Sequence, residues 1–325
     1  DCCKIPKKFL AANFGISKQS QLKERSKLKK FLIFVFYAFL LSLIFANTVF
    51  AKSLLYQSLK DGIGVRALSM GNAYTAVARG TSAGYYNPGG LVVPGSMYKY
   101  ENMDYKGAVY NSYTYNSLYL SPMEISNWKM EDINGDLVEV SSYAFGRRGK
   151  KGIDWGINYK SVTETYGGAK SSGWSMDLGL LLHLTQNINI GINAKDIVKE
   201  NVAIPSTLHT GLSFMPINES FILSTDFVFI KGKDKVNVNN HLGFEGCIAE
   251  GLILRGGFYD NNLTGGFKIV LPFIKLEYGF IYNMLDNREN INMVSFGLGK
   301  GLMKPRKKRR YSFFKPKSFA EFKIN

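Results

Sequence analysis

The sequence has few of the residues on which catalysis and metal binding depend. Its 325 residues include three cysteines and three histidines. It contains no Cys-x-x-Cys zinc spacing, no Gly-x-Ser-x-Gly nucleophile turn, no Walker phosphate loop and no His-Glu-x-x-His pair. The sequence therefore predicts a protein that is not an enzyme, with no catalytic residues, no metal and no cofactor.

A glycine pattern near residue 62 lacks the acidic partner that nucleotide binding requires. Gly62, Gly64 and Ala67 fit the spacing of the dinucleotide-binding fingerprint. That fingerprint needs a buried strand before it and an acidic residue about 20 residues after it. The preceding residues 56–61 are polar, and no Asp or Glu occurs between Asp61 and Glu101. This stretch is therefore not expected to bind a nucleotide.

An export signal is predicted over residues 27–51. Lys27, Lys29 and Lys30 precede a 16-residue apolar run, and the small residues Val49 and Ala51 supply a cleavage site before Lys52. The alternative is an uncleaved membrane anchor, because about 20 apolar residues suffice to span a bilayer. Residues 1–26 make no sense upstream of a signal, so we expect them to lie before the true translation start.

The net charge of +16 comes from the two ends of the chain. Residues 1–30 and 302–325 are strongly basic, and the body between them is close to neutral. The tail 302–325 interleaves Lys and Arg with aromatic residues, a composition that suits nucleic acid, anionic lipid or polysaccharide. Its residues 318–324 could instead add a short strand. Because export separates the protein from DNA, no nucleic-acid partner is expected.

Between these ends the dominant period is two. In residues 174–184 and 188–194, for example, large apolar residues alternate with small or polar ones, which is typical of strands with one apolar and one polar face. Short polar or Gly-containing turns separate the runs and indicate antiparallel hairpins. Thirteen strands are predicted, at 96–104, 107–121, 137–147, 152–163, 172–184, 187–198, 206–216, 219–231, 236–246, 251–259, 262–271, 273–283 and 291–300. Since bacterial single-chain barrels have even strand numbers, we expect about 14, the missing one within 107–133 or near the C-terminus.

Alternation alone fits either a soluble, secreted β-sandwich or a transmembrane barrel. Three features favour the barrel in a bacterial outer membrane. The predicted strands exceed the usual length of five or six residues. The 19 Tyr, 23 Phe and 3 Trp supply aromatic residues near strand ends, as membrane girdles require. The chain also carries an export signal. The expected fold is all-β, an antiparallel transmembrane β-barrel whose apolar faces meet outer-membrane lipid.

In such a barrel the polar strand faces line the lumen. Seven titratable residues are predicted to face it: Asp177, His183, Lys195, His209, His241, Lys275 and Glu277. The three histidines lie on separate strands without ligand spacing, so they are expected to fill the polar lumen and not to bind metal. Paired structural charges are the expected role of the others.

Residues 62–91 are dense in Gly, Ala and Ser and end in an Asn-Pro-Gly-Gly turn. The run Gly64–Ala73 and the run Ser82–Leu91 resemble the opening of the mature FadL-like and PorV/PorQ-like outer-membrane barrels. Arg79-Gly80 departs from that pattern, where an acidic pair is usual, and so does Gly89, where Ala is usual. The resemblance identifies as its motif residues Gly64, Arg66, Ala67, Met70, Gly71, Ser82, Asn87, Pro88, Gly90 and Leu91.

This resemblance implies an N-terminal plug (52–95) inside the lumen of a barrel (96–301). FadL-like members pass small hydrophobic compounds, whereas PorV-like members assist secretion and bind other envelope proteins. The predicted function is passage of small hydrophobic compounds across the outer membrane. The alternative is a secretion-associated scaffold. The expected partners are outer-membrane lipid together with hydrophobic small molecules or secretion-system proteins.

Overall fold

The computed structural model describes residues 62–92, 98–103, 109–115, 122–131, 135–150, 152–202, 204–216, 220–231, 236–284 and 290–298. The predicted extension 1–26, the signal 27–51 and the tail 302–325 lie outside the described residues. So do residues 52–61 and 93–95 of the predicted plug.

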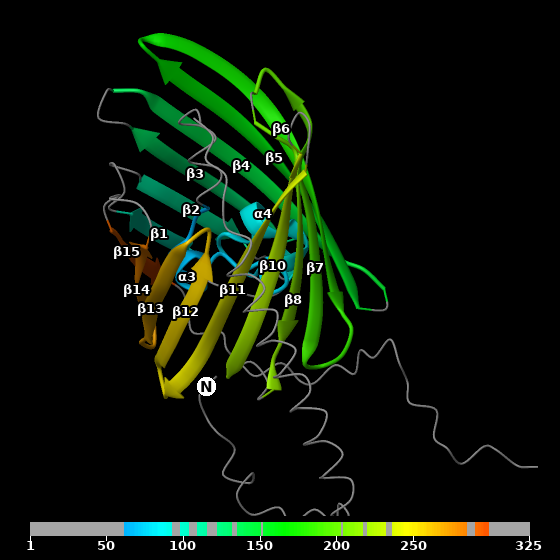
Figure 1. Ribbon diagram of the computed structural model, residues 1–325, viewed down its shortest axis with the longest axis vertical. Helices are drawn as coiled ribbons and strands as arrows, with labels where there is room; N and C mark the ends of the chain where they lie inside the picture. The colour runs from blue at the N-terminus through cyan, green and yellow to red at the C-terminus, as the bar shows by residue number, and fades with distance from the viewer. Residues whose placement is uncertain are drawn as a thin grey trace, which may run out of the picture.

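The described strands close into an antiparallel barrel, in which every strand pairs with both neighbours and β1 pairs with β15 (Figure 1). They are β1 (Tyr98–Met103), β2 (Val109–Tyr115), β3 (Met123–Glu131), β4 (Leu137–Arg148), β5 (Ile153–Tyr166), β6 (Ala169–His183), β7 (Ile188–Glu200), β8 (Thr207–Phe214), β10 (Phe221–Lys231), β11 (Val236–Ala249), β12 (Leu252–Tyr259), β13 (Asn262–Val270), β14 (Ile274–Asn283) and β15 (Ile291–Leu298).

The predicted antiparallel barrel is confirmed, and the alternative of a β-sandwich is wrong. A sandwich has two sheets with free edges, whereas the β1–β15 ladder, which joins Tyr98 to Leu298, leaves no edge in this sheet. Among the described residues, no helix is both long and apolar enough to cross a membrane.

The strand missing from the prediction is β3. Its inward face carries Glu124 and Ser126 at one end but Trp128 and Met130 at the other, and all four side chains are buried. Because the polar and apolar residues change faces along this strand, period-two hydropathy does not reveal it.

The outer face of the barrel is apolar and the inner face is polar. Large hydrophobic side chains on alternate residues are exposed on the outside, among them Ile125, Phe145, Trp155, Ile157, Leu178, Phe227, Phe244, Leu254, Phe267, Leu276, Phe280 and Val294. The residues between them point inward, and many are polar, charged and buried. A soluble protein has the opposite arrangement, whereas a bilayer requires this one.

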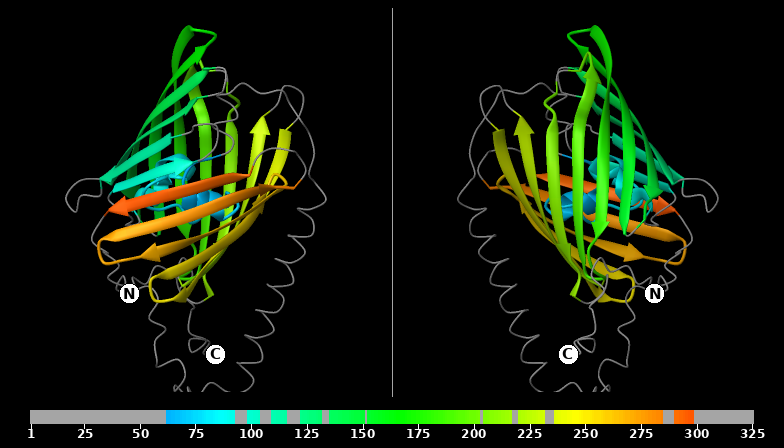
Figure 2. Two further views of the ribbon diagram at one scale, coloured as in Figure 1. Left: turned by 90° about the vertical axis from the view of Figure 1, so that its left-hand side faces the viewer. Right: turned by 90° about the vertical axis from the view of Figure 1, so that its right-hand side faces the viewer.

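Residues 62–92 lie within the barrel, and we call them the plug. Figure 2 shows the plug helices, in blue and cyan, surrounded by the strands. They are α3 (Val65–Ser69), α4 (Ala83–Tyr86) and the 3₁₀ helix η2 (Pro88–Val92). Nearly every plug residue is buried.

The plug helices are short because the chain turns immediately after them. Gly71 and Asn72 follow α3 and both have a φ of 59°, a left-handed conformation that ends a helix. Val65 and Leu68 then pack with Ile281 and Met293 of the wall. At the other end of the plug, Leu91 joins a larger apolar cluster.

Candidate functional site

An ion-pair cluster joins the plug to the barrel wall around Glu245 of β11. Arg66 of α3 donates Nε–H and Nη2–H to the two Glu245 oxygens, each at 2.7 Å. Arg255 of β12 donates to the same carboxylate at 2.7 Å and also to Glu277 of β14 at 2.7 Å. Arg79 of the plug lies 3.7 Å from Glu245. Lys268 lies 3.3 Å from Glu277. We call this group the Glu245 cluster; its members are Arg66, Arg79, Glu245, Arg255, Lys268 and Glu277.

Of the two plug cations in this cluster, Arg66 is held in its charged form by its partners. Burial opposes the charge of Arg66, but Glu245, Tyr74 and Glu277 outweigh that cost and raise the pKa of Arg66 above its ordinary value. Arg66 also donates to the Tyr74 hydroxyl at 2.6 Å. A bidentate guanidinium–carboxylate pair is among the stronger and more directional contacts in proteins. The cluster therefore fixes both the position and the orientation of α3.

Two more wall carboxylates bind the backbone of the plug. Asp226 of β10 accepts the N–H groups of Tyr74 and Thr75 at 2.9 and 2.8 Å. Glu124 of β3 accepts those of Ser82, at 3.1 Å, and Gly84, at 2.8 Å. Ser82 has a φ of 76° at the start of α4. These carboxylates therefore bind backbone donors in the turn after α3 and at the start of α4.

Side-chain amides connect the remainder of the plug. Asn87 donates to the Thr75 carbonyl oxygen within the plug at 2.9 Å and to the Leu180 carbonyl oxygen of the wall at 2.8 Å. Asn193 of β7 donates to the Tyr86 carbonyl oxygen at 2.9 Å. Polar contacts therefore reach the plug from strands on several sides of the lumen.

Glycines on the inner face of the wall let the plug backbone approach it directly. A Cβ added at Gly243 would lie 2.0 Å from the Met70 carbonyl oxygen, and one at Gly191 would lie 2.2 Å from that of Thr75. These distances are far inside van der Waals contact, so no other residue fits without movement. We call the inner-face glycines at which an added Cβ would meet backbone or side-chain atoms of the plug the glycine belt: Gly146, Gly156, Gly179, Gly191, Gly211, Gly243, Gly257, Gly266 and Gly279.

A second buried ion-pair cluster lies within the wall, on β5, β6 and β7. Lys160 contacts Asp177 at 2.8 Å and Asp196 at 2.5 Å. Ser175 donates to Asp196, and Asn158 donates to Asp177. Asp196 has a φ of 56° at an irregularity in the β6–β7 ladder. We call this group the Lys160 cluster.

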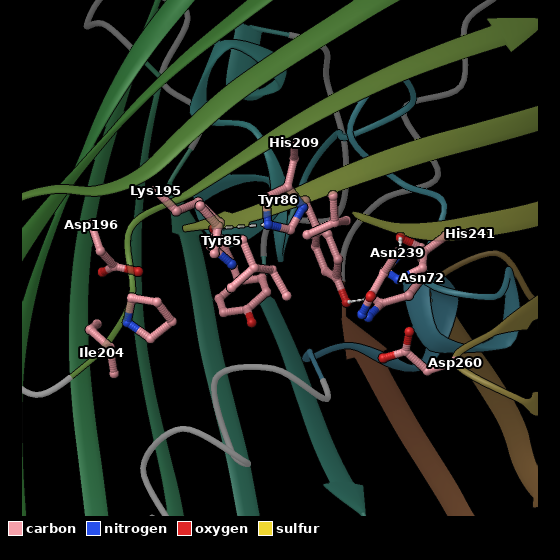
Figure 3. Close-up of a pocket in the computed structure, with 14 residues that line it drawn as sticks. Asn72, Tyr85, Tyr86, Lys195, Asp196, Ile204, His209, Asn239, His241 and Asp260 are labelled. Carbon is pink, nitrogen blue, oxygen red and sulfur yellow. Dashed lines mark hydrogen bonds between the residues drawn. The ribbon is translucent and has the colours of Figure 1, made fainter. Parts of the chain in front are cut away.

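A pocket lies between the plug and the inner face of β7, β8, β10 and β11, beside the β7–β8 and β12–β13 connections (Figure 3). Its cavity volume is about 50 Å³. The plug contributes Asn72, Tyr85 and Tyr86, and the wall contributes polar and apolar side chains from β7 to β11 and Asp260 just after β12. The Lys195 ammonium nitrogen lies 3.4 Å from the centroid of the Tyr85 ring.

The structure brings three of the predicted lumen residues to this pocket, namely Lys195, His209 and His241. Of these, His241 also contacts the Asn72 carbonyl oxygen at 3.3 Å. Asp177 lies in the Lys160 cluster, and Glu277 lies in the Glu245 cluster. Lys275 is buried on β14.

His183 is separate from the pocket histidines, bonded to Asn189 at 2.9 Å and Asp154 at 3.2 Å. In the part of the chain that the structure describes, no group of three or more His, Cys, Asp or Glu could hold a metal ion.

The predicted motif residues of the plug have different roles in the structure. Arg66 and Asn87 contact the wall through their side chains, and Ser82 does so through its backbone. Gly71 donates its N–H to Thr264 at 3.0 Å, and Gly90 lies against the Ala78 carbonyl oxygen. The rest of the motif is buried: Gly64, Ala67, Met70, Pro88 and Leu91.

The sequence reasoning missed Glu124 and Glu245 as plug anchors, and it missed the glycine belt. The sequence placed Glu245 on a polar strand face but could not identify its partner, because Arg66 is 179 residues away in the chain. The glycines carried a usable signal. Glycine is depleted in strands, so its recurrence at inward positions such as Gly156 and Gly191 indicates close approach of another backbone.

Comparison with known proteins supports the fold of an outer-membrane β-barrel channel. The structure is similar to the CymD monoaromatic hydrocarbon channel, with a TM-score of 0.58, 12% identity, and coverage of 74% of this chain and 98% of that one. It is also similar to the Pseudomonas putida toluene transporter TodX, with a TM-score of 0.55, 13% identity, and coverage of 73% and 98%. No protein-family model and no curated protein matches the sequence.

Proposed function

We propose that this protein is a channel of the bacterial outer membrane, of the FadL-like type, that passes small hydrophobic compounds, and that residues 62–92 gate it. Its apolar exterior supports residence in lipid, because each exposed Phe, Leu or Ile would meet water in a soluble protein. The similar barrels, CymD and TodX, are named as a monoaromatic hydrocarbon channel and a toluene transporter.

The observation that carries the gating role is the way in which the plug is held. Beside its apolar packing, the plug is held to the wall by ion pairs and hydrogen bonds to Glu245, Asp226 and Glu124. Water can replace such contacts when it enters the lumen, so the plug can separate from the wall at lower cost than an apolar core could. The adjoining pocket, with Val228, Ile230 and two tyrosines, offers an apolar surface to a compound that has entered the barrel.

The test is uptake by a Gram-negative host that lacks channels of this kind. Cells that express the protein should accumulate labelled toluene faster than cells that express a barrel with a closed lumen. Heat-dependent gel mobility of outer-membrane extracts provides the control for folding and location. Unchanged uptake of both aromatic compounds and fatty acids by cells with a correctly folded, membrane-located protein would contradict the channel role.

The competing function follows from the same motif, since Gly64–Ala73 resembles PorV/PorQ-like barrels as closely as FadL-like ones. A secretion-associated scaffold would hold other envelope proteins. Purification of the native protein in mild detergent distinguishes the two. A stoichiometric exported partner, together with unchanged uptake, would assign the scaffold role.

A further inference from the structure

A strongly basic turn joins β4 to β5. Residues 147–151 read Arg-Arg-Gly-Lys-Lys, so four of these five residues are basic. The turn lies at the end of the barrel where β1 begins and β15 ends, because β1, β3 and β5 all run away from that end. Its two arginines are adjacent in a strand, so their side chains point to opposite faces of the sheet.

Arg148 points into the lumen. Its guanidinium lies 3.5 Å from the carboxylate of Asp154, which is buried on the inner face of β5. It also donates an N–H to the Val92 carbonyl oxygen, at the end of the plug, at 3.1 Å. This cation of the turn is therefore used inside the barrel, where it holds the plug.

Arg147 points outward, to the face that meets lipid. It lies directly across the β4–β5 ladder from Trp155, and cross-strand partners share a face. The outward positions around it are apolar, with Phe145 50% and Trp155 37% exposed. Lys150 is exposed in the turn. Within the described part of the chain, neither the Arg147 guanidinium nor the Lys150 ammonium forms an ion pair or a hydrogen bond.

These outward groups lie at the depth of the lipid head groups. An exposed Trp near the end of a membrane strand places its ring at the boundary between hydrocarbon and water. Arg147 and Lys150 follow at the water side of Trp155, where their long side chains reach phosphate groups. A guanidinium matches a phosphate with two parallel hydrogen bonds, and an ammonium adds a point charge beside it.

This end of the barrel faces the periplasm. An exported chain reaches the outer membrane from the periplasm, and charged segments cross a bilayer only at high cost. Both ends of the sheet, Tyr98 and Leu298, lie at the end where the basic turn lies, and the strongly basic residues 302–325 follow. The lipids beside the turn are therefore the phospholipids of the periplasmic leaflet.

We infer that the outer side of the β4–β5 turn is a binding site for an anionic phospholipid. Arg147 and Lys150 bind its phosphate, while Trp155 and Phe145 contact its acyl chains. The lipid fixes the turn from outside, while Arg148 holds the end of the plug from inside. This inference goes beyond the proposed channel function and rests only on the part of it that places the barrel in the outer membrane.

The test uses tryptophan fluorescence of the full-length protein in liposomes of equal amounts of phosphatidylcholine and phosphatidylglycerol. Bromine atoms, which quench tryptophan on contact, are placed on the acyl chains of one lipid or the other, so that the composition stays constant. The chain has three tryptophans, of which Trp128 is buried on the inner face and gives a constant background. Trp174→Phe therefore leaves Trp155 as the reporter of this site, and Trp155→Phe leaves Trp174, near the opposite end of the barrel and hydrogen-bonded to Glu200 at 3.0 Å.

Phosphatidylglycerol should be preferred to phosphatidylcholine at Trp155 by about 30-fold, the effect of two cations near anionic lipid. Loss of one cation, in Arg147→Gln or Lys150→Gln, should leave about fivefold, and the double variant should have no preference. Arg147→Lys keeps the charge and should keep most of the preference. Lys170→Gln, at an exposed position near the start of β6, is the matched control and should behave like wild type.

Equal quenching of Trp155 by the two brominated lipids would overturn the inference. So would a preference that survives in the Arg147→Gln, Lys150→Gln double variant, or one that is equally strong at Trp174, since it would then belong to the whole barrel and not to this turn. Heat-dependent gel mobility and toluene uptake separate these outcomes from failure of the proposed function. A protein that does not insert into liposomes contradicts both proposals, whereas an inserted protein that prefers phosphatidylglycerol at Trp155 without any uptake has this lipid site but is not a channel.

Discussion

Replacing Glu245 with Gln should release the plug from the wall while leaving the barrel closed. Glu245 is the common acceptor for Arg66 and Arg79 of the plug and Arg255 of the wall. In the variant, one amide oxygen would remain for these donors, and the amide NH₂ would point at a guanidinium. Removing one partner from a buried ion pair typically costs 3–5 kcal/mol, because the remaining charges stay buried without compensation. About 3–5 kcal/mol is therefore the expected loss in plug docking.

Hydrogen–deuterium exchange of the plug amides measures this loss directly. Exchange of a protected amide requires local opening, and each 1.4 kcal/mol of lost stability accelerates exchange about tenfold where the opening equilibrium governs it. Amides of residues 65–75 should therefore exchange about 10²- to 10³-fold faster in the Glu245→Gln protein. Amides of the wall ladder β5–β6 should not change, because Glu245 contacts neither strand.

The matched control is Glu131→Gln. Glu131 is exposed and pairs with Lys129 at 3.6 Å, so its loss should cost well under about 1 kcal/mol. Identical plug exchange in the two variants would refute the assignment of Glu245 as an anchor. Equal acceleration in plug and wall would show that the cluster stabilises the whole barrel and not the docking of the plug.

Two further substitutions test the close fit of the plug and the position of the membrane. Gly243→Ala would place its Cβ 2.0 Å from the Met70 carbonyl oxygen and should displace the plug, which would increase ion conductance in planar bilayers. The control is Gly246→Ala on the same strand, whose Cβ would meet no atom nearer than 3.3 Å and which should conduct like wild type. Equal conductance of the two glycine variants would show that the wall yields at Gly243. Leu254→Arg, on the exposed face of β12, should lower the free energy of folding into liposomes by about 2–4 kcal/mol in urea titrations, the cost of Arg near the bilayer midplane; an unchanged urea midpoint would place this face outside the bilayer.

Much of the barrel could be predicted because one physical rule governs most of its strands. Lipid on one side and a polar lumen on the other impose a period of two, which is visible locally in runs such as 174–184 and 274–282. The rule failed at β3, where Trp128 and Met130 turn inward and Trp128 joins the apolar cluster that includes the plug. An apolar side chain that points into the lumen can be predicted only when the residues that it contacts there are known.

The candidate site could be predicted less well. The polar faces indicated that Lys195, His209 and His241 point inward, but they could not show that these residues meet in one pocket while His183 lies elsewhere. Lys195 and His209 lie on the paired strands β7 and β8, and His241 lies on β11, so the register of the ladders between them determines which residues lie at the same height. Sequence spacing does not encode that register across long stretches of chain.

The sequence by itself determined the alternation of the strands, the neutral body between basic ends, and the Gly-rich segment that forms the plug, because hydropathy, charge and glycine content are local properties. Only the tertiary structure decided which charges are paired. Glu245 meets Arg66 across 179 residues, and Lys160 takes both nearby carboxylates while Lys195 is left to the Tyr85 ring. Electrostatic partners are chosen by distance in space, and a closed barrel brings together residues that the chain keeps far apart.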